Sequence, residues 1–81
     1  MYVVYILRTS TKSLYIGQTK NLDKRLKEHA SKKGAGAKYF RLVESFNLVY
    51  TETFTTRSEA MKREWELKQW SKKEKEALIA T

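Results

Sequence analysis

The stretch LYIGQTKNLDKRLKEH, residues 14–29, decides the fold because a strand pattern in it runs directly into a helix pattern. Residues 14–19 are typical of a strand, and Asn21 is a residue type that favours the position just before a helix. The helix predicted to follow extends to about Lys32. It places Arg25 and His29 on one face, since residues four apart are neighbours on a helix. This pair is either an ordinary helix rim, with the arginine head in water, or one side of a phosphate pocket.

Two further strands are predicted on either side of this stretch in the sequence. Residues 2–7 form a short apolar run rich in β-branched and aromatic residues, which is typical of a strand covered on both faces. With residues 14–19 they predict a β-hairpin whose loop has several residues. Residues 46–54 alternate in side-chain type and are predicted as the third strand.

The remaining segments are predicted to be helices and a loop. Residues 56–59 match the capping box T-x-x-E, which predicts a helix over about 57–70, and a shorter helix follows over 72–79. Segment 32–38 is predicted as a basic loop, and segment 39–44 fits either a helical turn or an extended piece. The order β-β-α-(α)-β-α-α predicts an α+β fold, in which helices flank a small three-stranded antiparallel or mixed sheet.

Composition and charge narrow the class of protein. At 81 residues the chain is predicted to be one domain, residues 1–81, and the absence of cysteine excludes disulfides and thiolate metal sites. No segment has the pattern of a signal peptide or a membrane span, so we expect a soluble, cytoplasmic protein. The net charge of +8 comes wholly from residues 1–41, since 42–81 are balanced. This asymmetry favours nucleic acid as the partner and no membrane, although a merely soluble basic surface is the alternative.

Glu64 is the most unusual residue of the predicted helix 57–70. Ala60, Met61 and Leu67 are expected to define the inner face of that helix, with Glu64 in the middle of it. A carboxylate there needs a partner, because burying an unpaired charge costs several kcal/mol. The partner is either Arg25, in a buried ion pair, or a hydrated divalent cation such as Mg²⁺, which commonly takes only one or two protein carboxylates.

The first two predicted strands carry two tyrosines and a glycine, each of which is a weak functional signal when taken alone. Tyr5 and Tyr15 are each most simply explained as core or cross-strand residues. Gly17 within a strand suggests a close approach by a ligand or by another backbone segment.

These residues, taken in order, resemble the GIY-YIG nuclease domain. The matching features are VVY at residues 3–5, YIG at residues 15–17, an arginine in the following helix and a glutamate on a later helix. That domain occurs at the N-terminus of the excision-repair nuclease subunit UvrC, in homing endonucleases and in Slx-type nucleases. The chain is similar to small stand-alone bacterial members described as UvrC-like. It departs from the pattern in having Val3 for glycine, Gln18 where UvrC has lysine, and no matching asparagine after Glu64.

The resemblance implies roles for the shared residues. Arg25 would contact the scissile phosphate, and Glu64 would bind Mg²⁺ or Mn²⁺. Tyr5 would be the general base, with His29 as its partner or its rival, since histidine has a reference pKa of about 6.5 and tyrosine one of about 10. Tyr15 would belong to the same catalytic set.

The expected function is metal-dependent endonuclease cleavage of nucleic acid, DNA more than RNA, with little sequence specificity and a possible part in DNA repair or recombination. A monomer is favoured. The alternative is a non-catalytic nucleic-acid binder or adaptor with the same fold, which would gain nothing from the carboxylate of Glu64. Backbone contacts with nucleic acid are predicted for Lys12, Gly17, Gln18, Lys20, Lys32, Lys33 and Lys38.

Overall fold

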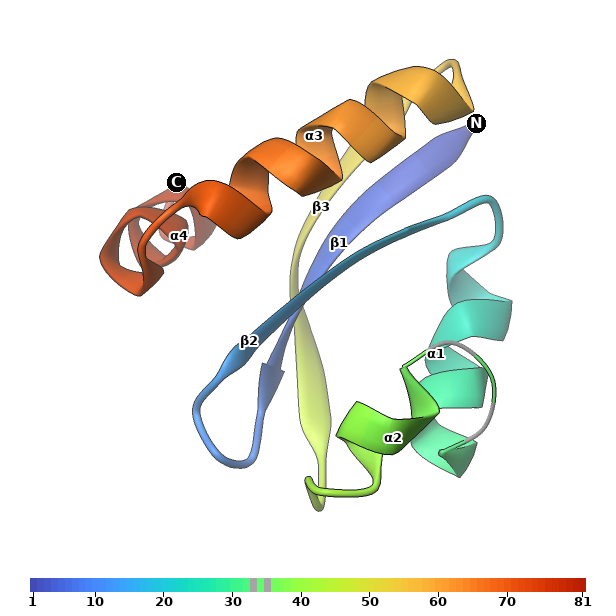
Figure 1. Ribbon diagram of the computed structural model, residues 1–81, viewed down its shortest axis with the longest axis vertical. Helices are drawn as coiled ribbons and strands as arrows, with labels where there is room; N and C mark the ends of the chain where they lie inside the picture. Colours follow the sequence, from blue (N-terminus) through green and yellow to red (C-terminus); the bar gives the residue numbers. More distant parts are fainter. Residues whose placement is uncertain (33, 35) are drawn as a thin grey trace.

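The computed structural model describes residues 1–32, 34 and 36–81 and has one three-stranded antiparallel sheet with helices packed on both sides (Figure 1). The strand order in the sheet is β2-β1-β3, so β1 is central and β2 is an edge strand. The predicted α+β fold is confirmed. The elements are β1 (Tyr2–Thr9), β2 (Leu14–Thr19), α1 (Leu22–Ser31), α2 (Ala37–Phe40), β3 (Phe46–Phe54), α3 (Arg57–Gln69) and α4 (Lys72–Ile79).

The central strand β1 is buried on both faces, as its continuous apolar run predicted. Val4 and Ile6 pack in a cluster with residues of α3 and α4, whereas Tyr5 and Leu7 pack in a second cluster with residues of α1 and α2. All four side chains are 0% exposed. Since successive side chains of a strand point to opposite faces, β1 supplies the core of both layers.

A β-bulge in β3 changes which layer its side chains join. Ile6 pairs with Tyr50 and Leu7 pairs with Leu48, so one residue of β3 is unpaired between them. Tyr50 therefore packs with the α3 and α4 cluster, while Phe46 packs with the α1 and α2 cluster. Strict alternation would have placed both residues on one face.

Helix α1 begins where the sequence predicted, with the side chain of Asn21 accepting a hydrogen bond from the backbone N–H of Lys24. The rim position considered for His29 was wrong. Ala30 is exposed, and His29 is 1% exposed instead of lying at a rim. Leu22, Leu26 and His29 have the i, i+4, i+7 spacing that also defines one helix face, and this face packs against the aromatic cluster.

The segment predicted as a basic loop is shorter than expected. Lys32 ends α1 in a left-handed conformation, and Lys38 lies in α2 instead of a loop. Lys33 lies outside the described residues. Tyr39 and Phe40 complete α2. Segment 39–44, for which a helical turn and an extended piece were both open, therefore begins as a helical turn.

Helix α3 has the predicted capping box between Thr56 and Glu59. Ala60 and Leu67 are fully buried against the sheet, but Met61 is 47% exposed, so its predicted place on the inner face was wrong. At about 100° per residue, Met61 lies about 120° from Leu67 around the helix, which turns it away from the sheet. Within the described part of the chain, no helix is long and apolar enough to span a membrane.

Candidate active site

The candidate site lies along the edge strand β2, between α3 on one side and α1 with α2 on the other (Figure 1). Tyr5 pairs with Gly17 of β2 in the sheet register. A Cβ atom at Gly17 would lie 2.6 Å from Cζ of the Tyr5 ring. The close approach predicted at Gly17 is therefore made by the phenol of Tyr5, which needs the space that a side chain would fill.

Tyr5 and His29 form a buried hydrogen-bonded pair. The Tyr5 hydroxyl lies 2.8 Å from Nε2 of His29, and the two side chains come from elements 24 residues apart in sequence. His29 stacks on Phe40 with ring centroids 4.2 Å apart and meets Phe46 edge-on at 6.3 Å. The histidine is thus fixed in orientation by aromatic packing on one side and by a phenol on another.

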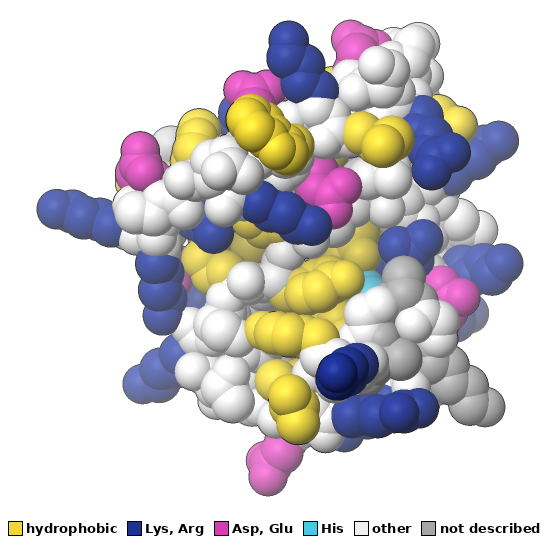
Figure 2. Space-filling view, viewed as in Figure 1, with side chains coloured by type: hydrophobic (Ala, Val, Ile, Leu, Met, Phe, Trp, Pro, Cys, Tyr) yellow, Lys and Arg dark blue, Asp and Glu magenta, His cyan; other side chains and the backbone are white. Residues whose placement is uncertain are grey.

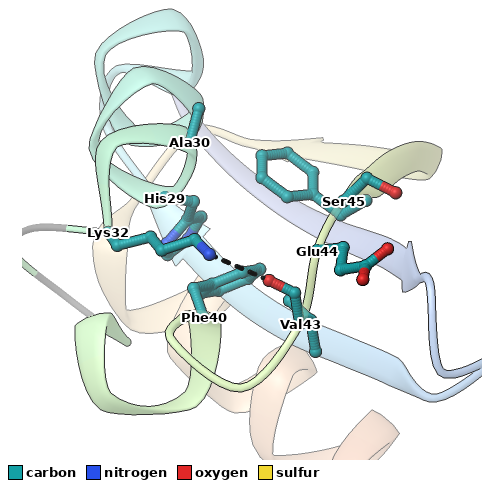
Figure 3. Close-up of a pocket in the computed structure, with 8 residues that line it drawn as sticks. His29, Ala30, Lys32, Phe40, Val43, Glu44 and Ser45 are labelled. Carbon is teal, nitrogen blue, oxygen red and sulfur yellow. Dashed lines mark hydrogen bonds between the residues drawn. The ribbon is translucent and has the colours of Figure 1, made fainter.

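Figure 3 shows His29 beside a small cavity of about 30 Å³, across from Phe40 and Val43. The Lys32 ammonium donates a hydrogen bond of 3.1 Å to the Val43 carbonyl across this cavity. Lys32 therefore ties the end of α1 to the segment before β3. The Lys32 ammonium would have to give up this hydrogen bond in order to make the nucleic-acid contact that the sequence predicts for it.

Tyr15 lies between the buried pair and the surface. Its ring packs edge-on against Phe40 at 4.8 Å and against His29 at 5.3 Å, with Tyr39 at 5.1 Å. Gly36 has φ +77°, a conformation that side-chain-bearing residues rarely adopt, and a Cβ there would lie 2.7 Å from the Tyr15 hydroxyl. Backbone of residue 36 thus lies directly over Tyr15.

The charged groups of the site gather around the Tyr15 phenol. Burial is the largest cause of a raised pKa at Tyr15, Lys68 and Arg25 lower that pKa, and Glu64 raises it. All three charges must therefore lie within electrostatic reach of one hydroxyl. Figure 2 shows this face, where hydrophobic side chains in the middle are bordered by acidic and basic ones.

Glu64 is paired with Lys68, a residue that was not predicted as its partner. Its carboxylate lies 3.0 Å from the ammonium of Lys68, with the Glu64 side chain 22% exposed and that of Lys68 53% exposed. Arg25 instead contacts Glu28 at 3.3 Å and the Gln18 carbonyl at 3.5 Å, so of the two alternatives for Glu64 the ion pair with Arg25 is not formed. The Glu-to-Lys spacing of four residues on α3 was the sequence signal for Lys68.

Arg25 also lines a basic groove of about 270 Å³ that extends from the site along the end of β2. Lys20 and Arg57 add two further cations to this groove, and Gln18 and Tyr2 line it as well. The sequence predicts nucleic-acid contacts for Lys20 and Gln18 but gives no signal for Arg57 and Tyr2. Arg57 is brought there by the start of α3, which no local pattern indicates.

The other predicted lysines are spread around the site. Lys12 lies in the turn between β1 and β2 and Lys20 follows β2, so the two flank a strand that is about 20 Å long. Lys38 is exposed on α2.

The donor set of the site suits only a lightly coordinated metal ion. Among residues 1–32, 34 and 36–81, no group of three or more histidine, cysteine, aspartate and glutamate side chains could hold a metal. Glu64 is the carboxylate at the site, and one carboxylate fits Mg²⁺ or a similar ion that keeps most of its waters. Such an ion would compete with the ammonium of Lys68 for the same oxygens.

The residues of the candidate site come from a strand pair that bears Tyr5, Tyr15 and Gly17, from a helix that bears Arg25 and from a later helix that bears Glu64. The model of the GIY-YIG catalytic domain family matches residues 1–77, and the chain belongs to that family.

Among its relatives, UPF0213 protein SSP2268 of Staphylococcus saprophyticus is 42% identical over 79 residues, covering 98% of this chain and 94% of the relative. UPF0213 protein SERP0126 of Staphylococcus epidermidis is 41% identical over 78 residues, covering 96% of this chain and 93% of the relative. The solution NMR structure of UPF0213 protein BH0048 from Bacillus halodurans is 44% identical, with a TM-score of 0.63 over 99% of this chain and 84% of that one. The chain is thus similar to small proteins that consist almost wholly of this domain, and their names state no activity.

Burial of Tyr5 predicts a specific dependence of stability on pH. Desolvation, with a smaller effect of the Tyr15 phenol, raises the pKa of Tyr5 from 10.0 to about 12. The unfolded chain therefore loses this proton first, and stability that is present below pH 10 is lost as the pH rises toward 12. From pH 9 to 11, the free energy of unfolding of the wild type should fall by about 1.4 kcal/mol more than that of Tyr5→Phe. Urea titrations at both pH values measure this difference, and equal losses in the two proteins would contradict it.

Proposed function

We propose that this protein is a metal-dependent endonuclease that hydrolyses phosphodiester bonds of nucleic acid, DNA more than RNA, with little sequence specificity. We further propose that it acts as a cytoplasmic monomer, with DNA repair or recombination as the setting. One observation carries the proposal: a lysine, an arginine and a glutamate all act on the half-buried Tyr15 phenol, and a hydrogen-bonded Tyr5–His29 pair lies behind it. A purely structural cluster would not need an acidic and two basic groups around one hydroxyl.

Arg25 is assigned to the phosphate. Its guanidinium lines the basic groove at the edge of the site. Glu28 on the same helix contacts the guanidinium at 3.3 Å. A guanidinium presents donors in a rigid fork that matches two oxygens of a phosphate, which a lysine cannot do. In this position Arg25 would hold the scissile phosphate and stabilise the charge that grows on its oxygens.

Glu64 is assigned to the metal. When bound, a divalent ion supplies Lewis-acid stabilisation of charge on the phosphate and the leaving oxygen. Lys68 would neutralise Glu64 in the free protein and contact phosphate once its place at the carboxylate is taken. The ion pair thus keeps the site from carrying an unpaired charge before substrate binds.

The Tyr5–His29 pair is assigned to the proton of the attacking water. Tyr5 alone is a poor acceptor, because a pKa of about 12 keeps it protonated at neutral pH. With His29 in the tautomer that is protonated at Nδ1, the Tyr5 hydroxyl donates its proton to Nε2 across 2.8 Å. Transfer of that proton to a neutral Nε2 would leave the Tyr5 oxygen able to take a proton from water, so His29 becomes the final acceptor. The two residues that were rivals in the sequence act here as one unit.

Cleavage tests the proposal directly. With Mg²⁺ or Mn²⁺, the wild type should cut labelled single-stranded, duplex or branched DNA, and EDTA or Glu64→Ala should abolish cutting because the single metal carboxylate is lost. Glu66→Ala, which removes a half-buried carboxylate two residues along α3, is the matched control and should remain active. Binding without cutting by both wild type and Glu64→Ala would favour the non-catalytic binder or adaptor.

The pH dependence of cleavage tests the proton acceptor. Tyr5→Phe and His29→Gln should each lower the rate by about 10²- to 10⁴-fold, since each breaks the same transfer path. Tyr39→Phe removes a hydroxyl that bonds Ser13 and should change the rate little. If Tyr5→Phe stays active and keeps an acid inflection that His29→Gln loses, then His29 acts directly and the Tyr5 assignment is wrong.

The salt dependence of binding tests the basic groove. Binding should weaken steeply as salt rises, because phosphate contacts release counterions. Lys20→Ala should reduce the slope of log affinity against log salt by about 0.9 if Lys20 contacts one duplex phosphate. Lys27→Ala, on the exposed face of α1, is the control of equal charge. Equal slopes for Lys20→Ala and the wild type would remove Lys20 from the interface.

A further inference from the structure

Helix α3 carries an exposed aromatic surface beside Glu64 that the catalytic roles leave unused. Trp65 is 64% exposed and Met61 is 47% exposed, although both are large hydrophobic side chains. Together with Glu64 and Lys68 they line a groove of about 220 Å³. Hydrophobic, acidic and basic side chains lie next to one another along α3 in Figure 2.

The position of this surface follows from helix geometry. With Leu67 pointing at the sheet, Glu64 lies about 60° around α3, Lys68 about 100°, and Met61 and Trp65 further in the same direction. Glu64 and Lys68 therefore form the boundary between the buried face and the aromatic surface. A nucleic-acid strand whose scissile phosphate lies between Arg25 and a metal on Glu64 would pass beside this groove, where its adjoining base can reach Met61 and Trp65.

The other tryptophan shows that exposure is particular to Trp65. Trp70 is half-buried against the core cluster of α3 and α4, and the guanidinium of Arg63 lies 5.2 Å from its ring centroid. Trp65, in contrast, is 64% exposed and shares its groove with Lys68. An aromatic side chain next to a cation in an open groove is the combination that proteins use to bind single-stranded nucleic acid.

We infer that Met61 and Trp65 form a stacking surface for an unpaired base next to the scissile phosphate, so that the substrate is single-stranded or contains unpaired bases at the cleavage point. The phosphate position rests on the proposed function. Two apolar side chains are too few for an interface with a second copy, which typically uses about 20–30 residues a side. Lys68 in the same groove, together with the net charge of +8 of the chain, favours a polyanion over an apolar protein partner.

The test measures binding in EDTA, where no cleavage occurs. In Trp70→Phe, all tryptophan emission comes from Trp65, and a short oligothymidylate should quench it more strongly than a blunt hairpin duplex does. In the otherwise unchanged protein, Trp65→Ala should weaken oligothymidylate binding about tenfold and hairpin binding less than about twofold. Leu42→Ala removes another exposed hydrophobic side chain, just past α2, and should change neither affinity.

Three results would overturn the inference. These are an unchanged oligothymidylate affinity in Trp65→Ala, an equal loss for both probes, or a dimer in sedimentation that Trp65→Ala abolishes, which would assign the surface to a second copy. The binding and cleavage outcomes are independent. Normal cutting with no effect of Trp65→Ala on binding sinks this inference alone, whereas Trp65-dependent binding without cutting by any variant sinks the nuclease alone.

Discussion

The phenol of Tyr5 lies against the backbone of β2 at Gly17, where any side chain would collide with the ring. This close approach sets the rest of the site. It places the Tyr5 hydroxyl within hydrogen-bonding distance of His29. The imidazole of His29 in turn occupies a place among the aromatic rings of α1 and α2, stacked on Phe40. Helices cover both faces of the central strand β1, so the Tyr5 hydroxyl is a polar group in the interior of the protein. A buried hydroxyl and a buried imidazole then satisfy each other, which removes most of the cost of burying them.

The charged groups obey a second constraint, which is the low polarity around Tyr15. A carboxylate beside aromatic rings is costly unless a cation is near. Lys68 supplies that cation from the same helix, and Arg25 supplies another from α1. The protein therefore holds acidic and basic groups side by side at the site. In the proposed function these groups would exchange partners on binding a phosphate and a metal, so that Arg25 and Lys68 would stabilise the free site in one state and contact substrate in the other.

Most of the fold could be predicted from the sequence because its signals are local. The turn residues, the Asn21 cap and the capping box of α3 each depend on neighbours within four residues, and the predicted elements agree with the structure. The errors concern directions in space. Rotation of α1 put His29 inside and Ala30 outside, and rotation of α3 turned Met61 to the surface, because both depend on which partner the helix meets. The bulge in β3 and the approach of Arg57 to Arg25 are likewise long-range outcomes. The site residues were identified through the family resemblance, whereas their pairing needed the structure.

Helix α3 joins the buried core to the candidate site. Its side chains pass in a continuous order from buried Ala60 and Leu67, through half-buried Glu64, to exposed Trp65. The opposite flank of the same helix is fixed to the sheet by Arg63, which forms a bidentate ion pair with Glu52 of β3. This pair and the buried residues hold the rotation of the helix, so the direction of Glu64 is set by contacts far from the phosphate. A substitution at Glu52 could therefore alter the site without touching it, by letting α3 turn a few degrees about its axis.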